Sequence, residues 1–199
     1  MTRLANTEKA GYYPLPPSVT DLIIPTITAP HGGRILDPAA GEGTALITLA
    51  EKLGLDPFGV ELHEGRAQAA RDAIDQLVVQ NGNDAFSTRI LHESYLNLVT
   101  SRGGYNLLYL NPPYDYDEED GRLEYQWLVH TRLWLQQDGV LVWVVPQHML
   151  RFRKATRYIL SWYDQVQIYR FPDEEYDQFK QIVLFGVHRP KAVPLMARW

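Results

Sequence analysis

Residues 105–114 read Tyr-Asn-Leu-Leu-Tyr-Leu-Asn-Pro-Pro-Tyr, an apolar stretch that runs directly into a proline-rich turn. The stretch over 105–110 predicts a buried strand, and Asn111 begins where that strand ends. In α/β sheets, ligands bind at the carboxyl ends of the strands. A proline-stiffened strand end is the structural alternative, but this placement favours a functional site.

The turn Asn111-Pro112-Pro113-Tyr114 is suited to activating an amino group that is conjugated to a π-system. Such a nitrogen is a poor nucleophile because its lone pair is delocalised. The Asn111 side-chain oxygen can accept one of its N–H groups and the Pro112 carbonyl the other, which frees the lone pair. Both prolines fix the backbone φ, and the Tyr114 ring offers a face for stacking. These four residues are the predicted catalytic residues.

Strand and helix patterns alternate along most of the chain. Strands are predicted over 34–37, 58–61, 89–92, 105–110 and 139–145. Helices are predicted over 18–27, from the glycine-rich turn to about 53, and over 64–80, 122–137 and 150–162. Two closing strands, 165–171 and 181–188, are joined by an acidic loop and predict a hairpin. This order predicts an α/β fold with a doubly wound, mostly parallel seven-stranded sheet and an antiparallel edge hairpin.

The length of 199 residues predicts a single domain over 1–199. The chain has no cysteine, no apolar run long enough to span a membrane and no apolar signal core, so a cytoplasmic protein is expected. Nineteen basic and 24 acidic residues give a net charge of −5, which argues against a strongly electrostatic nucleic-acid binder. The six histidines have no ligand spacing, so no metal site is expected.

A second motif, Asp37-Pro-Ala-Ala-Gly41-Glu-Gly43-Thr, lies between the first strand and the first helix of the sheet. Its glycines allow a sharp turn and a close approach to a ligand. A dinucleotide fingerprint would place a third glycine where Leu46 stands, and no Gly-Lys-Ser/Thr follows. Glu61 ends the second strand about twenty residues later, where an acid can accept both ribose hydroxyls.

Together these motifs resemble class I methyltransferases that use S-adenosylmethionine, in the amino-methylating branch with an Asn-Pro-Pro-Tyr signature. The resemblance implies a Rossmann-like methyltransferase fold and S-adenosylmethionine as cofactor. It divides the domain into an N-terminal cofactor-side segment (1–30), a cofactor-binding half (31–110) and a catalytic, substrate-binding half (111–199). The cofactor-binding residues that it implies are Tyr13 and Pro14, in Gly11-Tyr-Tyr-Pro, together with Asp37, Ala39, Gly41, Gly43, Glu61, Leu62, Ser94 and Tyr95.

By this resemblance, Glu61 binds the ribose hydroxyls and Leu62 covers the adenine. The family usually has an aspartate after the third strand that accepts a hydrogen bond from the adenine amino group of the cofactor. Here Ser94 occupies that position, and a shift of one residue would give the role to Glu93.

Substrate contacts are expected from Tyr114. By the resemblance they are also expected from Phe179, which lies where some relatives have an aromatic residue against the flipped base. Residues 151–157 contain four basic side chains, among which Arg151 and Arg153 are predicted to meet phosphates. A solvated helix face is the alternative for this basic run. The acidic runs 115–120 and 173–177 are interpreted as solvated loops, and Trp127, Trp134, Trp143 and Trp162 as core residues.

The predicted reaction is methyl transfer to an exocyclic amino nitrogen, with N6 of adenine in DNA favoured over RNA. The same turn would serve a protein methyltransferase that acts on a glutamine amide. A non-catalytic, cofactor-binding subunit of a methyltransferase complex is a third alternative. Sequence-specific enzymes of this branch carry a separate recognition region. Three alternatives therefore stay open: the specificity is low, a specificity subunit or partner domain supplies it, or the chain is the catalytic piece of something longer.

Overall fold

The computed structural model describes residues 14–81, 89–114, 116–117 and 121–194. Its centre is a seven-stranded sheet in the order β3-β2-β1-β4-β7-β9-β8. The strands are β1 (Arg34–Asp37), β2 (Asp56–Glu61), β3 (Ile90–His92), β4 (Tyr105–Leu110), β7 (Leu135–Pro146), β8 (Tyr163–Arg170) and β9 (Gln181–His188). Strands β3, β2, β1, β4 and β7 pair in parallel, and β9 is antiparallel to both β7 and β8. This confirms the predicted fold class.

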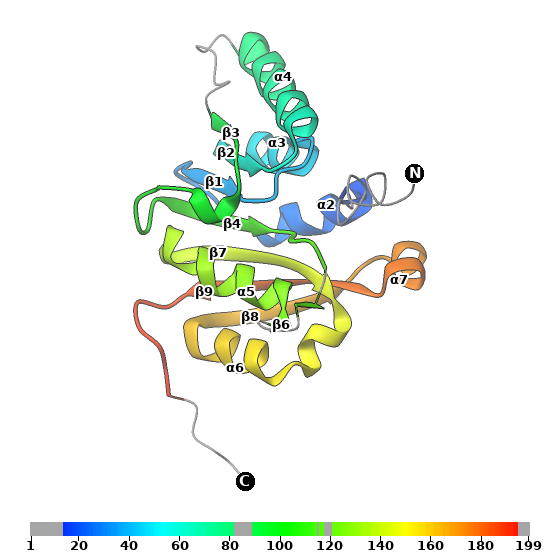
Figure 1. The fold of residues 1–199 in the computed structure, drawn as a ribbon, viewed down its shortest axis with the longest axis vertical. Coiled ribbons are helices and arrows are strands. Elements are labelled where there is room, and N and C mark those ends of the chain that lie inside the picture. The colour runs from blue at the N-terminus through cyan, green and yellow to red at the C-terminus, as the bar shows by residue number, and fades with distance from the viewer. Residues whose placement is uncertain (1–13, 82–88, 115, 118–120, 195–199) are drawn as a thin grey trace.

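Helices cover both faces of the sheet, and Figure 1 shows α4 at its β3 end and α6 at its β8 end. The helices are α2 (Pro17–Ile23), α3 (Thr44–Leu53), α4 (Glu64–Asn81), α5 (Leu123–Thr131), α6 (Arg153–Trp162) and α7 (Asp173–Phe179). Short 3₁₀ segments are η1 (Ile24–Thr26), η3 (Tyr95–Asn97), η4 (Arg132–Trp134) and η5 (Gln147–Arg151). A small ribbon, β5 (Tyr116–Asp117) and β6 (Gly121–Arg122), follows β4.

The central strands are buried on both faces, as their apolar sequences predict. Leu107 and Tyr109 of β4 pack into one core with residues of α2, α3 and α4. Leu108 and Leu110, which point to the other face, pack with residues of α5 and α6. Because β4 lies between β1 and β7 and packs on both faces, its end is held firmly, and Asn111 therefore lies near the middle of the carboxyl edge of the sheet.

Two predictions about the second half of the chain are wrong: the end of one helix, and a loop that contains a helix. The helix predicted to reach residue 137 ends at Thr131, because Leu135 is already buried and paired with Tyr105 of β4. The acidic loop between the last two strands contains helix α7. Pro172 precedes this helix, and three acidic residues fill its first turn, where negative charge favours the helix dipole.

Candidate active site

A cavity opens at the carboxyl ends of β1, β2 and β4. Its lining also includes the segment before α2, the start of α3 and one residue of α5. Nine predicted site residues line it: Pro14, Asp37, Ala39, Glu61, Leu62, Ser94, Tyr95, Asn111 and Pro113. One cavity is therefore formed at the ends of β1, β2 and β4, because parallel strands bring their carboxyl ends to the same edge of the sheet.

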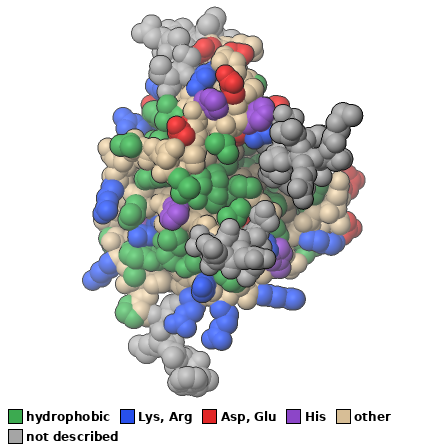
Figure 2. Space-filling model, in the orientation of Figure 1, with side chains coloured by type: hydrophobic (Ala, Val, Ile, Leu, Met, Phe, Trp, Pro, Cys, Tyr) green, Lys and Arg blue, Asp and Glu red, His purple; other side chains and the backbone are tan. Residues whose placement is uncertain are grey.

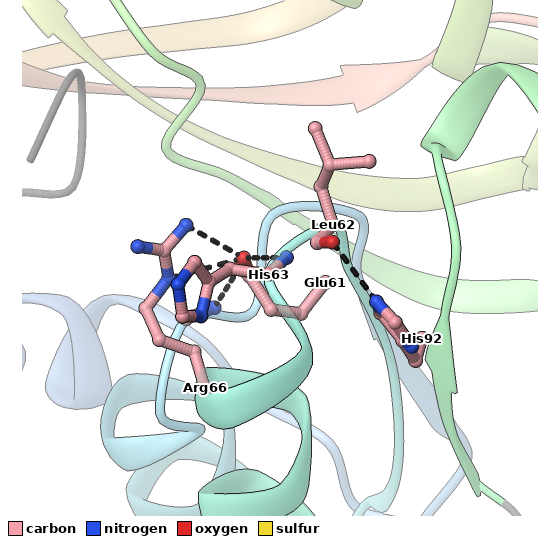
Figure 3. Close-up of polar contacts among 6 residues, drawn as sticks. Glu61, Leu62, His63, Arg66 and His92 are labelled. Atoms are coloured by element: carbon pink, nitrogen blue, oxygen red, sulfur yellow. Dashed lines mark hydrogen bonds and ion pairs between the residues drawn. The ribbon is translucent and has the colours of Figure 1, made fainter. Parts of the chain in front are cut away.

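The Glu61 carboxylate is anchored at the end of β2. Its Oε2 accepts the Gly41 backbone N–H at 2.9 Å, and its Oε1 accepts the His63 N–H at 2.8 Å. Arg66, in the first turn of α4, donates to Oε1 from Nε at 3.0 Å and from Nη2 at 2.8 Å. Figure 3 shows Arg66 and His63 around this carboxylate, while the Leu62 side chain points away from it. Glu61 is therefore a buried acceptor whose geometry is set by the protein's own hydrogen bonds.

Asp37, at the end of β1, is the second acidic group of the cavity. It is almost fully buried, and its Oδ1 accepts the Ala39 backbone N–H at 2.9 Å. Burial raises the pKa of Asp37 to about 7; the Ala39 hydrogen bond opposes this shift, and the nearby negative charge of Glu61 adds to it. A cationic ligand group beside Asp37 would favour its ionised form.

The two loop glycines lie next to the cavity lining and not in it. Gly41 and Gly43 have φ values of 56° and 83°, a region that favours glycine, and neither lines the cavity. Gly41 gives its N–H to Glu61. A Cβ atom on Gly43 would lie 3.0 Å from the Cβ of Ala70 in α4. Their structural role is the close packing of loop, strand and helix.

An aromatic wall closes another side of the cavity. The Tyr95 and Trp127 rings stack with their centroids 3.6 Å apart and their planes at 24°. Trp127 is half-buried: it packs against the second core, as interpreted from the sequence, and it also lines the cavity, which was not predicted. Its neighbour Leu128 takes the position on α5 that faces the sheet, which turns Trp127 toward Tyr95. Burial raises the pKa of Tyr95 to about 12, so this ring carries a neutral hydroxyl at pH 7.

Both residues considered for the adenine contact lie in the lining. Ser94 Oγ accepts the Leu96 N–H at 3.3 Å and so caps η3. The Glu93 carboxylate accepts the Ser94 N–H at 2.7 Å and the Asn97 amide at 3.0 Å. These two hydrogen bonds hold the pKa of Glu93 below its usual range. The cavity therefore has a hydroxyl and an ionised carboxylate next to each other beyond β3.

In the Asn-Pro-Pro-Tyr turn, the Tyr114 hydroxyl donates to Asn111 Oδ1 at 2.8 Å. An amide oxygen has two lone pairs, so this contact occupies one of them and orients the amide plane. Pro113 lines the cavity, whereas Pro112 is buried behind it. Sequence reasoning gave Tyr114 a stacking role and did not predict this hydroxyl contact.

The remaining predicted site residues lie outside the cavity lining. Phe179 ends α7, next to Lys180, whose carbonyl accepts the Gln147 N–H at the end of β7. Arg151 and Arg153 are exposed on η5 and α6. Tyr13 lies outside the described residues, as do Asp115 and residues 118–120 of the acidic run.

Several lining residues were not among the predicted site residues, and Arg66 and Trp127 are the two with the most consequence for a ligand. Arg66 follows Glu61 by five residues, so its place in the first turn of α4 is a signal that it can reach back to the strand end. Trp127 has no such local signal, because its contact with Tyr95 depends on how α5 packs against the sheet. Among the described residues, no group of three or more His, Asp or Glu side chains could hold a metal ion. No helix in the same part of the chain is long and apolar enough to cross a membrane.

Comparison with known proteins places this cavity in a family context. A family model described as an uncharacterised methyltransferase family (DUF6094) matches residues 1–195. The chain belongs to this family. It is therefore a methyltransferase-family protein, and the class I methyltransferase fold that its sequence resembles is the fold it has. No curated protein matches the chain.

Solved structures share this fold at low sequence identity. A Listeria monocytogenes protein described as a class I S-adenosylmethionine-dependent methyltransferase superposes with a TM-score of 0.69 at 18% identity, over 92% of this chain and 63% of its own. A methyltransferase subunit of a type I restriction-modification system from Streptococcus thermophilus gives 0.67 at 18%, over 92% and 46%. A tRNA (m1A58) methyltransferase from Aquifex aeolicus gives 0.61 at 11%, over 92% and 72%. The chain thus spans less than two thirds of the first protein and less than half of the second.

Proposed function

We propose that this protein transfers a methyl group from S-adenosylmethionine to an exocyclic amino nitrogen, N6 of adenine in DNA. The observation that carries the proposal is the shared cavity. Asn111, suited to hold an amino group, lines the same cavity as the buried acids Asp37 and Glu61. Direct transfer requires the substrate amine and the cofactor to bind next to each other, as a shared cavity allows.

Each part of the proposed cofactor has a group of suitable chemistry in the cavity. S-adenosylmethionine combines a cationic amino-acid end, a ribose diol and a planar adenine, and supplies an electrophilic methyl group when bound. Asp37 suits the cationic end, and the anchored Glu61 carboxylate suits the two ribose hydroxyls. The Tyr95–Trp127 wall suits a planar base, with Glu93 and Ser94 beside it for its amino group. Leu62, Ala39 and Pro14 complete the apolar lining.

The substrate amine is proposed to bind at the Asn-Pro-Pro-Tyr turn. Asn111 Oδ1 and the Pro112 carbonyl each accept one N–H, which localises the nitrogen lone pair for attack on the methyl carbon. The methyl group would pass from sulfur to this nitrogen: the carbon–sulfur bond would break as the carbon–nitrogen bond forms, sulfur would keep the bonding electron pair, and the methylated nitrogen would release its proton to water. The nitrogen becomes acidic only after methylation, so no strong base is required among the lining residues. Catalysis then rests on positioning and on hydrogen bonds that improve in the transition state.

DNA is the proposed substrate because a solved structure with this fold is a restriction-modification methyltransferase subunit, whereas the turn itself suits an adenine amino group and a glutamine amide equally. The chain spans 46% of that subunit. We therefore propose that a specificity subunit or further domain supplies sequence recognition. A base within a duplex would have to be flipped out to reach Asn111, with Tyr114 and Phe179 as stacking partners.

The substrate class can be tested with methyl-labelled S-adenosylmethionine and three acceptors: unmethylated DNA, RNA of the same sequence and a set of glutamine-containing peptides. The proposal predicts label in DNA with wild-type protein and none with Asn111→Ala. Label in the peptides alone would replace it with the glutamine amide reaction. Cofactor binding without label in any acceptor would favour a non-catalytic subunit.

A further inference from the structure

The surface of η5 and α6 carries four cations for which the described residues provide no acidic partner. Arg151, Arg153, Lys154 and Arg157 are all exposed, and no ion pair or hydrogen bond links their side chains to another described residue. Elsewhere in the described chain, six cations each contact a carboxylate: Arg66, Arg89, Arg122, Arg170, Lys180 and Arg189. Lys52, Arg102 and Lys191 have no carboxylate contact there either, but they lie far apart in the sequence, whereas the four cations of η5 and α6 lie within seven residues. In a chain of net charge −5, this concentration of unpaired positive charge requires a reason.

Helix stability does not supply that reason. Arg153 and Lys154 lie in the first turn of α6, where the helix dipole disfavours positive charge. The first turn contains no acidic residue, and the residue before it makes no side-chain cap. Ala155 and Ile159 already bury the inner face of α6. Arg153 and Lys154 therefore do not stabilise the first turn of the helix that carries them.

The position of the four cations relates them to the cavity. They follow the carboxyl end of β7, and β7 pairs with β4 so that Trp143 is opposite Leu110, the residue before Asn111. The cations thus lie on the segment that leaves the strand next to β4, after the same carboxyl edge of the sheet at which Asn111 lies. Figure 2 shows Lys and Arg side chains projecting along the lower edge of the molecule, where Figure 1 places α6.

Aromatic side chains line a groove next to two of these cations. Lys154 and Arg157 border it together with Tyr125, Tyr158 and Trp162. Tyr125 and Tyr158 contact edge to face, with ring centroids 5.9 Å apart. Cations beside aromatic faces are the combination with which proteins hold a nucleic-acid strand, through its phosphates and its bases.

We infer that the face formed by Arg151, Arg153, Lys154 and Arg157 binds the sugar-phosphate backbone beside the target base. The inference rests on the proposed function, and it assigns to this face the contacts that position the substrate. Arg153 and Arg157 are one turn apart, about 6 Å along the helix, close to the rise of two nucleotides. Contacts of this kind are independent of sequence, so they fit a chain that takes its specificity from a partner.

The inference is tested by charge reversal. Arg153→Glu/Arg157→Glu is compared with Lys52→Glu/Arg102→Glu, which makes the same change in net charge. Lys52 lies in the last turn of α3 and Arg102 precedes β4; both are exposed, and both lie at the opposite edge of the parallel strands. Fluorescence anisotropy with labelled duplex DNA, in the absence of cofactor, gives the affinity of each protein between about 50 and 200 mM salt. Calorimetry with S-adenosylmethionine monitors the cavity separately.

Each cation that contacts a phosphate contributes about 0.9 to the slope of log affinity against log salt. The α6 variant is expected to lose about 1.8 from this slope, while the control variant keeps the wild-type slope and both keep cofactor affinity. Equal losses in the two variants, or none in the α6 variant, would overturn the inference and leave the proposed function standing. If wild-type protein binds no nucleic acid, the inference is wrong. The proposed function is then judged separately, by methylation at high DNA concentration.

Discussion

The cavity and the α6 face differ in how their charged groups are held. In the cavity, Glu61 and Asp37 are 5% and 2% exposed, and backbone N–H groups fix their oxygens. On α6, Arg153 and Arg157 are long, exposed side chains without a described partner. The first arrangement suits a small ligand of one shape, because the protein has already fixed the geometry. The second suits a polymer whose charge repeats along its length. Asn111 lines the cavity and follows β4, which pairs with β7, the strand that leads to η5 and α6, so it is the proposed point where the two ligands meet.

The largest effect is expected at this meeting point. Asn111→Ala should abolish methyl transfer and leave cofactor affinity within a few-fold, because Asn111 binds the amine. Asn111→Asp, which keeps an acceptor oxygen, should retain measurable activity. Label transfer and calorimetry on the same preparations check this. Loss of cofactor binding in Asn111→Ala would show that the two regions cannot be separated as described.

Glu61→Ala should have the next largest effect, and only on the cavity. Removing an acceptor of hydrogen bonds to a charged group costs about 1.5–3 kcal/mol, so cofactor affinity should fall roughly 10- to 150-fold. DNA affinity, measured without cofactor, should not change. Calorimetry with unaltered cofactor affinity would place the ribose site elsewhere.

Asp37 should make cofactor binding depend on pH. Below its pKa of about 7 the carboxyl group is protonated in the free protein, and a cationic ligand group favours the ionised form. Binding therefore releases a proton. Affinity should rise by up to about tenfold per pH unit toward pH 7 and then level off. Asp37→Asn should remove this rise. Calorimetry in buffers with different ionisation enthalpies measures the proton directly; a flat profile in wild-type protein would contradict the assignment.

Tyr114→Phe separates orientation from stacking and should have the smallest effect. It removes the hydroxyl that donates to Asn111 but keeps the aromatic face. A single hydrogen bond contributes about 1 kcal/mol, so the rate of transfer should fall about fivefold. Tyr114→Ala should reduce it further, because stacking contributes about 1–3 kcal/mol more. Equal losses in single-turnover rates of the two variants would assign the whole effect to the hydroxyl.

The fold was predictable because each strand and turn carries a local signal. The apolar strand before Asn111, the glycine loop after β1 and the acid at the end of β2 are all at carboxyl ends of parallel strands. A parallel order must bring such ends to one edge, and the cavity forms there. The Tyr95–Trp127 contact, which was not predicted, depends on packing between distant segments. Trp127 meets Tyr95 only because α5 docks with Leu128 inward, and no periodicity in the sequence specifies that rotation.

The same distinction explains the errors in the second half of the chain. Helix propensity continues beyond Thr131, but pairing of Leu135 with Tyr105 ends the helix and begins β7. The acidic composition of 173–177 suggested a loop, whereas Pro172 and the acidic first turn favour a short helix. The basic residues of 151–157 were visible in the sequence. That they have no described acidic partner became clear only from the structure.

Nucleoside mass spectrometry tests the central claim most directly. DNA treated with the protein and S-adenosylmethionine would be digested to nucleosides, with Asn111→Ala as the control. The proposed function predicts a methyl group on N6 of adenine that is absent from the control. A methyl group at a ring atom, or an equal amount of methylated adenine with Asn111→Ala, would contradict it.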